Sequence, residues 1–552
     1  MKTDITIGEY LISRLRENHV DHMFGIPGDY VLGFYDLVDK SPEIKMINTC
    51  DEQGAGFAAD AYARVRGLGV VCITYGVGGL KVANTTAQAY AEKSPVIVIS
   101  GGPGLKERET EGLLHHQITD FDAQKRVFEE LTIAETIIDS PETARHEIDR
   151  IIGSVLKYKR PGYIELPRDL VFVPCEPGPQ WKDKRATSNK DALKEAVAET
   201  TRLINNAERP VILAGVELHR FGLEKVIGDF AKKHGIPVAA TILAKSVVAD
   251  IEEFYLGVFE GGTEQVTKYV ESSDCLLLLG TFLSDLNLGM FTSGIEPTNS
   301  IYAASDRISI KHHSYDSILF EDFIRELATA PVEKREFKPF PRPQVATSFP
   351  EELPGDSEVT VAGLFQYLNN FIKSDTVIVA DVGDALFGAN DLFVYKAAGF
   401  FSPAYYASLG FAVPGALGIQ LAKPEGRPLV LVGDGAFQMT GTELSSIARY
   451  GLNPIVIVLN NDGYGTERPM LDGSYNDVHP WNFSKIPEVL GCGTGFKVQT
   501  YEQLQHALAE ADLNSNSFTI IDVVLDRHDR SPAMVRLTSK LAERVKRSAQ
   551  SS

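Results

Sequence analysis

The stretch Pro428-Leu-Val-Leu-Val-Gly-Asp-Gly435 decides the fold class of this 552-residue chain. Its short apolar run, bounded by proline and glycine, indicates a strand that is buried on both faces of a sheet. A helical pattern over 443–450 follows, and a second apolar run, 454–459, ends in Asn460-Asn461. Strand, helix and strand in this order predict a βαβ unit and therefore an α/β fold with a parallel sheet.

The same alternation extends through the rest of the chain. Before the first helix, Thr6-Ile7-Gly8-Glu9 has the pattern of a capping box. Further strands are expected over 22–26, 70–74, 95–100, 162–166, 210–215, 236–240, 275–280, 376–380 and 518–525. Two stretches rich in proline and charge, 174–189 and 332–357, interrupt the pattern and predict linkers. We therefore expect three doubly wound parallel-sheet domains, over residues 1–180, 190–335 and 355–552.

Composition excludes several classes of function. The net charge of −20 would repel a nucleic-acid backbone, so no nucleic-acid partner is expected. The five cysteines never form a Cys-x-x-Cys pair, which favours free thiols in a reducing compartment over disulfides or structural zinc. No signal peptide and no window of 18 apolar residues is present, so we expect a cytoplasmic protein without a membrane partner.

Polar residues follow both strands of the βαβ unit. Asp434 comes directly after the first strand, and Asn461 and Gly463 follow the second. Ligands of parallel α/β sheets gather at the carboxyl ends of the strands, and Mg²⁺ prefers oxygen ligands that it shares with phosphate. Asp434, Asn461 and the Gly463 carbonyl can therefore hold a metal ion that carries a diphosphate. Each motif taken alone could also be an ordinary tight turn.

With these motifs the chain resembles the thiamine-diphosphate enzymes, whose pattern is GDG followed after about 25 residues by NN. The resemblance covers nearly the whole chain and is closest to the pyruvate, phenylpyruvate and indolepyruvate decarboxylases. Its motifs are Phe24-Gly-Ile-Pro-Gly-Asp-Tyr30, Glu52 with 58–64, Gly76-Val-Gly78, Leu114-His-His116, Gly433-Asp-Gly-Ala-Phe-Gln438 and Asn460-Asn-Asp-Gly-Tyr-Gly-Thr-Glu467.

The resemblance implies a role for each matching residue. Glu52 would bind N1′ of the aminopyrimidine, the Ala407 carbonyl would accept from its 4′-amino group, and Leu409 would bend the cofactor. A 2-oxo acid would then lose CO₂ and leave as an aldehyde, through an ylide and an enamine of thiamine diphosphate. The acid–base residues would be Asp29, His115, His116 and Glu467, beside Glu52. Cofactor contacts would come from Glu52, Ala407, Leu409, Gly433, Asp434, Gly435, Ala436, Asn461, Gly463, Tyr464 and Glu467, with Asp434, Asn461 and Gly463 on Mg²⁺.

Each of these residues also has an ordinary structural interpretation. Asp29 alone is a turn residue, His115-His116 alone is a polar loop pair, and Glu467 next to Arg468 is compatible with a solvated ion pair. His312-His313 is such a histidine pair, which we expect on the surface. The chain also departs from many relatives at Val382, Asp384 and Gly79, which leaves the substrate range and some diphosphate contacts open.

The resemblance further implies a pocket for the side chain of the substrate. It would be lined by Val382, Thr466 and Met470, with a second wall from Met534, Leu537 and Leu541. Thr466 stands where pyruvate-specific relatives carry isoleucine, which predicts a roomier apolar pocket for aromatic or branched-chain 2-oxo acids.

Assembly and activity are open to alternatives. The resemblance implies active sites shared by two subunits, hence a homodimer and a homotetramer built of two dimers. The central domain lacks Gly-x-Gly-x-x-Gly in 214–219, so no flavin is expected. The first alternative activity is a carboligase such as an acetolactate synthase, and the second is a non-catalytic thiamine-diphosphate binding protein.

Overall fold

The computed structural model describes residues 5–110, 112–175, 187–343 and 355–539. Parts of both expected linkers, and Leu541, lie outside these residues. The chain divides into two compact units: unit 1 is Met1–Lys184, Tyr406–Glu425 and Gln438–Leu452, and unit 2 is Arg185–Tyr405, Gly426–Phe437 and Asn453–Ser552. No helix among the described residues is both long enough and apolar enough to cross a membrane.

Unit 1 contains an entirely parallel sheet in the order β2-β1-β3-β4-β6-β5. Its strands are β1 (His22–Gly25), β2 (Lys45–Asn48), β3 (Gly69–Ile73), β4 (Val96–Gly102), β5 (Ala134–Ile137) and β6 (Gly162–Pro167). The strand order changes direction at β1 and β3, and a ligand crevice is expected outside the carboxyl ends of strands at such a point.

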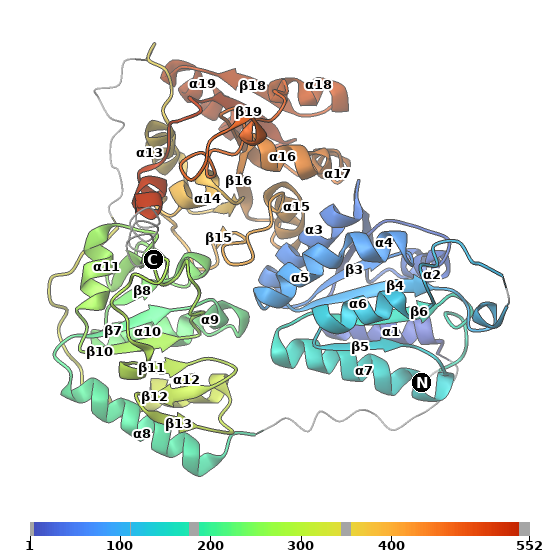
Figure 1. The fold of residues 1–552 in the computed structure, drawn as a ribbon, viewed down its shortest axis with the longest axis horizontal. Coiled ribbons are helices and arrows are strands. Elements are labelled where there is room, and N and C mark those ends of the chain that lie inside the picture. The colour runs from blue at the N-terminus through green and yellow to red at the C-terminus, as the bar shows by residue number, and fades with distance from the viewer. Residues whose placement is uncertain (1–4, 111, 176–186, 344–354, 540–552) are drawn as a thin grey trace. The chain divides into compact units, whose positions relative to one another are not determined.

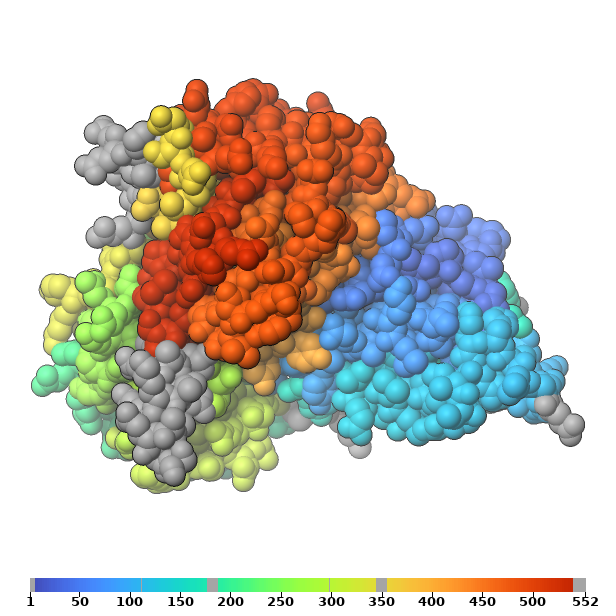
Figure 2. Space-filling model, turned by 45° about the horizontal axis from the view of Figure 1, so that its top comes forward, coloured from blue at the N-terminus to red at the C-terminus, as the bar shows by residue number. Residues whose placement is uncertain are grey.

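Helices cover both faces of this sheet, with α1 and α7 on one face and α3 and α5 on the other (Figure 1). Their bounds are α1 (Ile7–Glu17), α2 (Leu32–Lys40), α3 (Glu52–Arg66), α4 (Val77–Lys81), α5 (Ala83–Ala91), η1 (Glu107–Glu109), α6 (Ala123–Leu131) and α7 (Pro141–Tyr158). The predicted capping box at Thr6 is confirmed, because the Thr6 hydroxyl and the Glu9 carboxylate each accept from the other residue's backbone N–H. In the space-filling view the blue and cyan residues of this sheet and its helices form one continuous body (Figure 2).

Segments from late in the sequence complete unit 1. They are α15 (Ala412–Ala422), η4 (Gly441–Glu443) and α17 (Leu444–Arg449). Helix α15 is apolar on all sides and packs against α3, where Phe411 meets Phe57 edge to face and the Arg64 guanidinium lies 4.9 Å from the Phe411 ring. An all-round apolar helix is stable only where it is covered on every side.

The first sheet of unit 2 has the order β13-β12-β11-β10-β7-β8-β9. Its strands are β7 (Pro210–Ala214), β8 (Val238–Ala240), β9 (Tyr255–Val258), β10 (Cys275–Leu279), β11 (Ile301–Ala303), β12 (Ile308–Ile310) and β13 (His313–Tyr315). Five strands are parallel, but β12 and β13 form an antiparallel edge. A two-residue turn with Lys311 at φ +52° joins this pair, and such turns connect only antiparallel strands.

The second sheet of unit 2 is parallel, in the order β15-β14-β16-β17-β19-β18. Its strands are β14 (Thr376–Ala380), β15 (Phe400–Phe401), β16 (Arg427–Gly433), β17 (Ile455–Asn460), β18 (Thr494–Val498) and β19 (Thr519–Val524). The helices of unit 2 are α8 (Lys190–Asn206), α9 (Glu217–Arg220), α10 (Glu224–His234), α11 (Glu264–Glu271), α12 (Phe320–Thr329), α13 (Val361–Phe371), α14 (Asp384–Ala389), α18 (Ile486–Leu490) and α19 (Tyr501–Leu513), and α16 (Asp434–Thr440) begins in this unit. The predicted α/β class with mostly parallel sheets is confirmed.

Candidate active site

Polar residues gather after the carboxyl ends of the strands in unit 1. Asp29 follows β1, Glu52 follows β2, and His115 and His116 follow β4. Arg168, which we did not predict, comes directly after β6. The sequence signal for Arg168 was its position at the end of an apolar run, because the carboxyl ends of parallel strands share one edge of the sheet.

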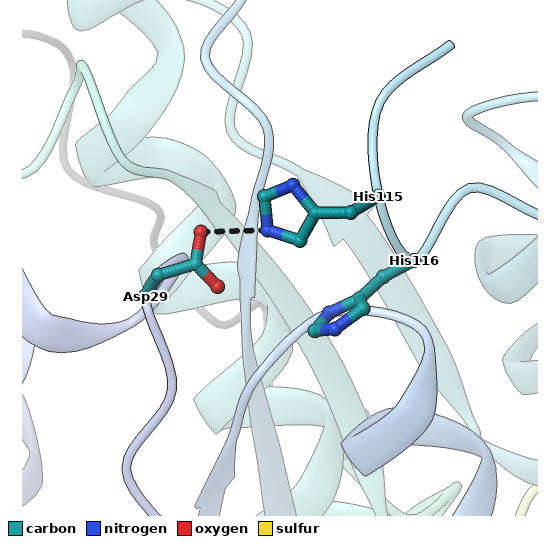
Figure 3. A group of neighbouring side chains, drawn as sticks. All are labelled: Asp29, His115 and His116. Carbon is teal, nitrogen blue, oxygen red and sulfur yellow. Dashed lines mark hydrogen bonds and ion pairs between the residues drawn. The ribbon is translucent and has the colours of Figure 1, made fainter.

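Asp29, His115 and His116 form a compact cluster (Figure 3). Nε2 of His115 lies 2.9 Å from Oδ2 of Asp29, within hydrogen-bond distance. The two imidazole rings are 4.8 Å apart at an angle of 76°. Tyr30 stacks on His115 with centroids 4.8 Å apart, and its hydroxyl donates to the His115 carbonyl at 3.1 Å. The structure thus brings these three predicted residues together.

Carboxylates and imidazoles are groups that can exchange protons with one another. One carboxylate oxygen and one nitrogen of each imidazole lie within 4.8 Å of one another, close enough for transfer of a proton directly or through one water molecule. Nδ1 of His116 is buried and has no hydrogen-bond partner within the described ranges. Two imidazoles and one carboxylate would also suit a transition metal, whereas Mg²⁺ prefers an all-oxygen set.

Arg168 forms ion pairs with both Asp29 and Glu107. Nη1 of Arg168 lies 3.3 Å from Oδ2 of Asp29, and Nε of Arg168 donates to Glu107 at 2.9 Å. Hydrogen bonding of the Glu107 carboxylate with Arg168 lowers the pKa of Glu107. The guanidinium also lies over the Tyr30 ring at 4.9 Å. Arg168 is therefore a fixed positive charge beside the cluster.

Glu52 is held by the start of α3. The Asp51 side chain caps this helix by accepting from Gln53 N–H at 2.7 Å. The buried carboxylate of Glu443 accepts from Cys50 N–H at 3.0 Å and Asp51 N–H at 3.1 Å. Oε2 of Glu52 lies 2.8 Å from the Lys81 ammonium, and the pKa of Lys81 is raised by its hydrogen bonds with Asp51 and Glu52. We predicted neither Lys81 nor Glu443.

The segment around Ala407 is also part of unit 1. Ala407 is exposed and has φ +59°, so its backbone belongs to neither a helix nor a strand. The preceding Tyr406 N–H donates to Glu92 at 2.9 Å, and Asn84 donates to the Ser408 hydroxyl at 2.8 Å. Leu409 is half-buried beside this turn. The segment is thus fixed by the same unit that carries Glu52.

The metal ligands expected from the sequence lie together in unit 2. Strands β16 and β17 are neighbours, with Gly433 paired with Leu459, so Asp434 and Asn461 follow adjacent strand ends. The Asp434 carboxylate accepts from Gly435 N–H at 2.7 Å and Gly463 N–H at 3.0 Å. Asn460 turns away and donates to Asp522 at 2.8 Å, which leaves Asn461 as the amide of this pair beside Asp434.

This cradle fits Mg²⁺ and a diphosphate. Asp434 is 1% exposed, and burial raises its pKa to about 6, so the ionised carboxylate would be stabilised by a nearby cation. The Gly463 carbonyl accepts one N–H, from Gly465, and keeps a lone pair for a ligand. A side chain on Gly433 would meet nothing within 4 Å, so there is open space in front of this strand end. Asp434, Asn461 and Gly463 are the residues that would hold the metal.

Glu467 and the pair His312-His313 can be compared directly with the expectations from the sequence. Glu467 is exposed, and Arg468 pairs with Asp472 at 2.8 Å and Asp477 at 2.7 Å, so the alternative of a Glu467–Arg468 ion pair is wrong. His312 and His313 are exposed, as expected, and His313 hydrogen-bonds to Glu199 at 3.0 Å.

The expected pocket residues are partly brought together. A side chain on Gly383, next to Val382, would lie 3.1 Å from the Thr466 hydroxyl oxygen, so these two loops are adjacent. Met470 is 53% exposed, whereas Met534 is fully buried in the core of unit 2. Asp384 hydrogen-bonds with the hydroxyl of Ser531 and accepts from its N–H at 2.8 Å, so it anchors the segment that leads to Met534.

Comparison with known proteins adds independent findings. Residues 5–125, 197–322 and 381–523 match the N-terminal TPP binding domain, the central domain and the C-terminal TPP binding domain of thiamine pyrophosphate enzymes. An indole-3-pyruvate decarboxylase from Azospirillum brasilense is 35% identical over 542 residues, which is 96% of this chain and 97% of that protein. An alpha-keto-acid decarboxylase from Mycolicibacterium paratuberculosis is 32% identical over 541 residues, 96% of each chain.

Proposed function

The chain belongs to the thiamine pyrophosphate enzymes, and on that premise we propose that it converts a 2-oxo acid to an aldehyde and CO₂. The observation that best supports this activity is the cluster of Asp29, His115 and His116. A carboxylate oxygen of Asp29 and one ring nitrogen of each histidine lie within 4.8 Å of one another. Two relatives that match nearly full length are named as 2-oxo acid decarboxylases, which supports the proposal.

The proton balance of the reaction explains why such a cluster is needed. A 2-oxo acid anion that loses CO₂ must gain one proton to become an aldehyde. Bound thiamine diphosphate supplies the electron sink for the loss of CO₂. The protein must then deliver a proton to the former carbonyl carbon and move another at the oxygen. We assign these transfers to Asp29, His115 and His116, and we propose Glu467 as a fourth acid–base residue.

Cofactor binding is proposed from two groups of residues. Asp434, Asn461 and Gly463 hold Mg²⁺ and the diphosphate, because they provide a buried carboxylate and two further oxygens at adjacent strand ends. Glu52 binds the aminopyrimidine, with the Ala407 carbonyl and the Leu409 side chain. Gly433, Gly435, Ala436 and Tyr464 complete the diphosphate contacts.

The alternative activity is carboligation, as in an acetolactate synthase. The acid–base cluster favours decarboxylation, because it can protonate the carbon that a carboligase would join to a second carbonyl compound. Incubation with pyruvate separates the two activities. We expect acetaldehyde and CO₂ in equal amounts, and acetolactate as the main product would contradict the proposal. A non-catalytic binding protein would form no product from pyruvate, phenylpyruvate or 4-methyl-2-oxopentanoate.

We further propose that the preferred substrate is an aromatic or branched-chain 2-oxo acid. Thr466 lies beside Gly383, the residue after Val382, and a longer side chain at position 466 would narrow the space there. Each additional buried methylene of a substrate contributes about 0.8 kcal/mol, so a pocket of sufficient width favours large side chains.

The substrate proposal is tested by Thr466→Ile. This variant should shift kcat/KM toward pyruvate, whereas the control Thr494→Ile changes an exposed residue of β18 and should leave the preference unchanged. A higher kcat/KM for pyruvate than for phenylpyruvate and 4-methyl-2-oxopentanoate in the unmodified enzyme would refute the proposal.

Assembly and location are also proposals. We propose a homodimer in which two subunits contribute to each active site, and a homotetramer of two such dimers. A cytoplasmic location is consistent with five cysteines that are all free in the structure.

A further inference from the structure

The histidines lie on a segment that has little structure of its own. Residues 112–122, here called the histidine segment, contain no helix and no strand, and they run from the region after η1 to the start of α6. His116 has φ +67°, which is uncommon for a residue with a side chain. Such a segment needs anchors outside itself if its imidazoles are to stay opposite Asp29.

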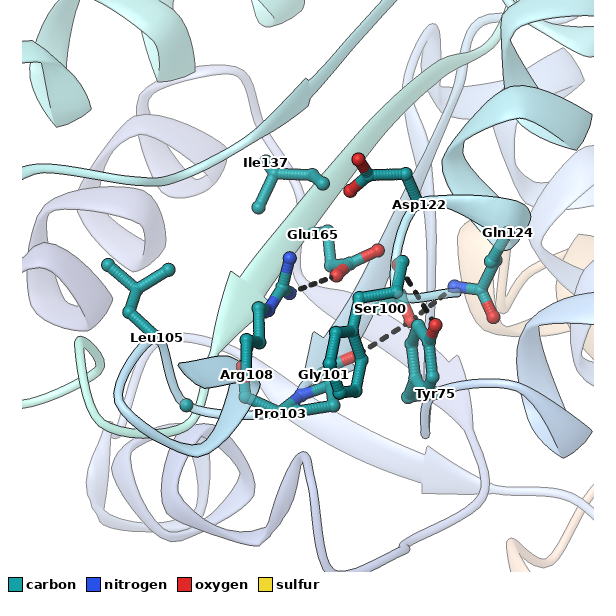
Figure 4. Close-up of polar contacts among 12 residues, drawn as sticks. Tyr75, Ser100, Gly101, Pro103, Leu105, Arg108, Asp122, Gln124, Ile137 and Glu165 are labelled. Atoms are coloured by element: carbon teal, nitrogen blue, oxygen red, sulfur yellow. Dashed lines mark hydrogen bonds and ion pairs between the residues drawn. The ribbon is translucent and has the colours of Figure 1, made fainter. Parts of the chain in front are cut away.

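A buried polar network lies next to Asp122, at the end of this segment (Figure 4). Its centre is Glu165 in β6, which is completely buried. Oε1 of Glu165 accepts from Arg108 at 2.5 Å, and Oε2 accepts from the Tyr163 hydroxyl at 2.6 Å. The Tyr163 oxygen accepts in turn from Nε2 of Gln124 at 2.7 Å, and the same amide nitrogen donates to the Ser100 hydroxyl at 2.8 Å. Figure 4 shows Arg108 and Gln124 approaching this centre from opposite sides.

The network joins the two ends of the histidine segment. Arg108 belongs to η1, before the segment, and Gln124 belongs to α6, directly after it. Both are connected through Glu165 and Tyr163, which lie two residues apart on the same strand. A third anchor is the Tyr75 hydroxyl, which donates to the Phe121 carbonyl at 2.9 Å.

The network also reaches the backbone of His116. Oε1 of Gln124 accepts from Gly76 N–H at 2.7 Å. Gly76 has φ +68°, and a side chain on it would lie 2.4 Å from the His116 carbonyl oxygen, so this turn packs directly against His116. A change at Gln124 would therefore shift the turn at Gly76, which packs against His116.

Every polar group of the network has a partner, which explains how a carboxylate is tolerated here. Burial raises the pKa of Glu165, while Tyr163 and Arg108 stabilise its ionised form and Asp122 opposes it. Loss of the Tyr163 hydroxyl would leave Oε2 of Glu165 buried without its donor and one Gln124 hydrogen without its acceptor. A partly satisfied buried network is less stable than one with all partners present.

We propose that Glu165, Tyr163 and Gln124 are positioning residues, which fix His115 and His116 opposite Asp29 by joining both ends of the histidine segment. All three side chains are completely buried. This inference rests on the proposed function, because it gives these residues a role in the proton transfers assigned to the histidines. A displacement of about 1 Å of a catalytic group can reduce a rate about 100-fold.

The test compares Tyr163→Phe with Tyr10→Phe. Tyr163→Phe removes one hydroxyl and keeps the ring, which stacks on Phe128 at 4.5 Å. Tyr10→Phe removes a similar tyrosine–carboxylate hydrogen bond, 2.9 Å to Asp149, between α1 and α7 of the same unit. We expect Tyr163→Phe to lower kcat at least 10-fold with KM changed less than threefold, and Tyr10→Phe to stay within twofold in both.

Two further readouts separate positioning from simple destabilisation. Amide hydrogen exchange of peptides within 112–123 should become faster in Tyr163→Phe and stay unchanged in Tyr10→Phe. Exchange at C2 of bound thiamine diphosphate should stay within threefold in both variants, because Glu52 is held by α3, Lys81 and Glu443. In the double variant with Gln124→Met, the loss of kcat should be smaller than the product of the two single losses, because both residues act in one network.

Each contrary result has a distinct meaning. Unchanged kcat or unchanged amide exchange in Tyr163→Phe would overturn the inference, as would a parallel loss of C2 exchange. If the unmodified enzyme decarboxylates no 2-oxo acid, the proposed function fails, whereas the amide-exchange comparison still decides whether the network holds the segment.

Discussion

At the scale of single residues, the structure separates two kinds of carboxylate in unit 1. Glu52 sits at the start of α3 beside Lys81, whereas Asp29 faces two imidazoles. Different surroundings allow carboxylates of one protein to take different chemical roles. This difference supports the proposal that Glu52 acts on the cofactor and Asp29 in proton transfer with the histidines.

This difference predicts distinct defects for three variants. Glu52→Gln should slow hydrogen–deuterium exchange at C2 of bound thiamine diphosphate by about 10²-fold or more, because a proton-transfer partner is lost. Asp29→Asn and His116→Ala should reduce turnover by a similar factor and largely retain C2 exchange. NMR of the quenched cofactor measures the exchange, and equal losses in all three variants would contradict the assignment.

Asp384 predicts a dependence of stability on pH. Desolvation raises its pKa to about 6, from about 3.9 for an unperturbed aspartate. The folded state thus binds a proton more tightly, and this group destabilises the fold by up to about 3 kcal/mol above pH 6, less as pH falls toward 4. Relative to the unmodified protein, Asp384→Asn should therefore gain Tm as the pH rises from 4 to 7.

Thermal unfolding of the cofactor-free protein at several pH values measures this difference. The control is Asp512→Asn, which changes an exposed carboxylate beside Lys373. A Tm difference between Asp384→Asn and the unmodified protein that does not grow with pH would show that the buried carboxyl is not the cause.

At the scale of elements, the loop after β17 depends on Gly463. This residue has φ +135°, and a side chain on it would lie 2.0 Å from the Asn476 carbonyl oxygen. Gly463→Ala should therefore destabilise the protein by roughly 2–5 kcal/mol and weaken binding of Mg²⁺ and thiamine diphosphate at least 10-fold. The stabilisation of the protein by both ligands, followed as a Tm shift, measures the effect.

Gly451 provides the matched control for this loop. It also has positive φ, +66°, but a side chain on it would meet nothing within 4 Å. Gly451→Ala should cost about 1–2 kcal/mol and leave cofactor binding unchanged. Similar binding losses in both variants would mean that backbone strain in general, and not the position of the Gly463 carbonyl, governs the effect.

The elements also show how far the sequence could be interpreted. Long apolar runs predicted their strands well, and the run 376–380 coincides with β14. Eight strands were missed, and each has at most five residues, too short a run for a clear periodic pattern: β2, β5, β9, β11, β12, β13, β15 and β18. The helix expected over 443–450 is confirmed as α17, Leu444–Arg449, which directly follows the 3₁₀ turn Gly441–Glu443.

The candidate site was predictable where residues follow a strand within a few positions. Asp434 and Asn461 could be placed from their spacing alone, because neighbouring strand ends bring them together. Lys81 and Glu443 could not be placed in this way, because their contacts with the start of α3 bridge 29 and about 390 residues of sequence. Glu165 lies inside a strand, where a carboxylate gives no sign of its partners.

At the scale of the whole molecule, Glu52 belongs to unit 1 and Asp434 to unit 2. The proposed dimer, in which two subunits contribute to each site, predicts complementation. Glu52→Gln and Asp434→Ala should each be inactive alone. When equal amounts of the two variants exchange subunits at random, about half of the dimers become hybrids with one intact site each, so up to about a quarter of the unmodified activity should return. A fully active monomer in sedimentation would contradict the shared site.

The central claim is that this chain uses thiamine diphosphate and Mg²⁺ to release CO₂ and an aldehyde from a 2-oxo acid. The most direct test is to strip the protein with EDTA, dialyse it, and measure both products after each cofactor is returned separately and together. We predict aldehyde and CO₂ in a 1:1 ratio, with activity only when Mg²⁺ and thiamine diphosphate are both present. Activity without thiamine diphosphate, or CO₂ release with acetolactate in place of the aldehyde, would contradict the account.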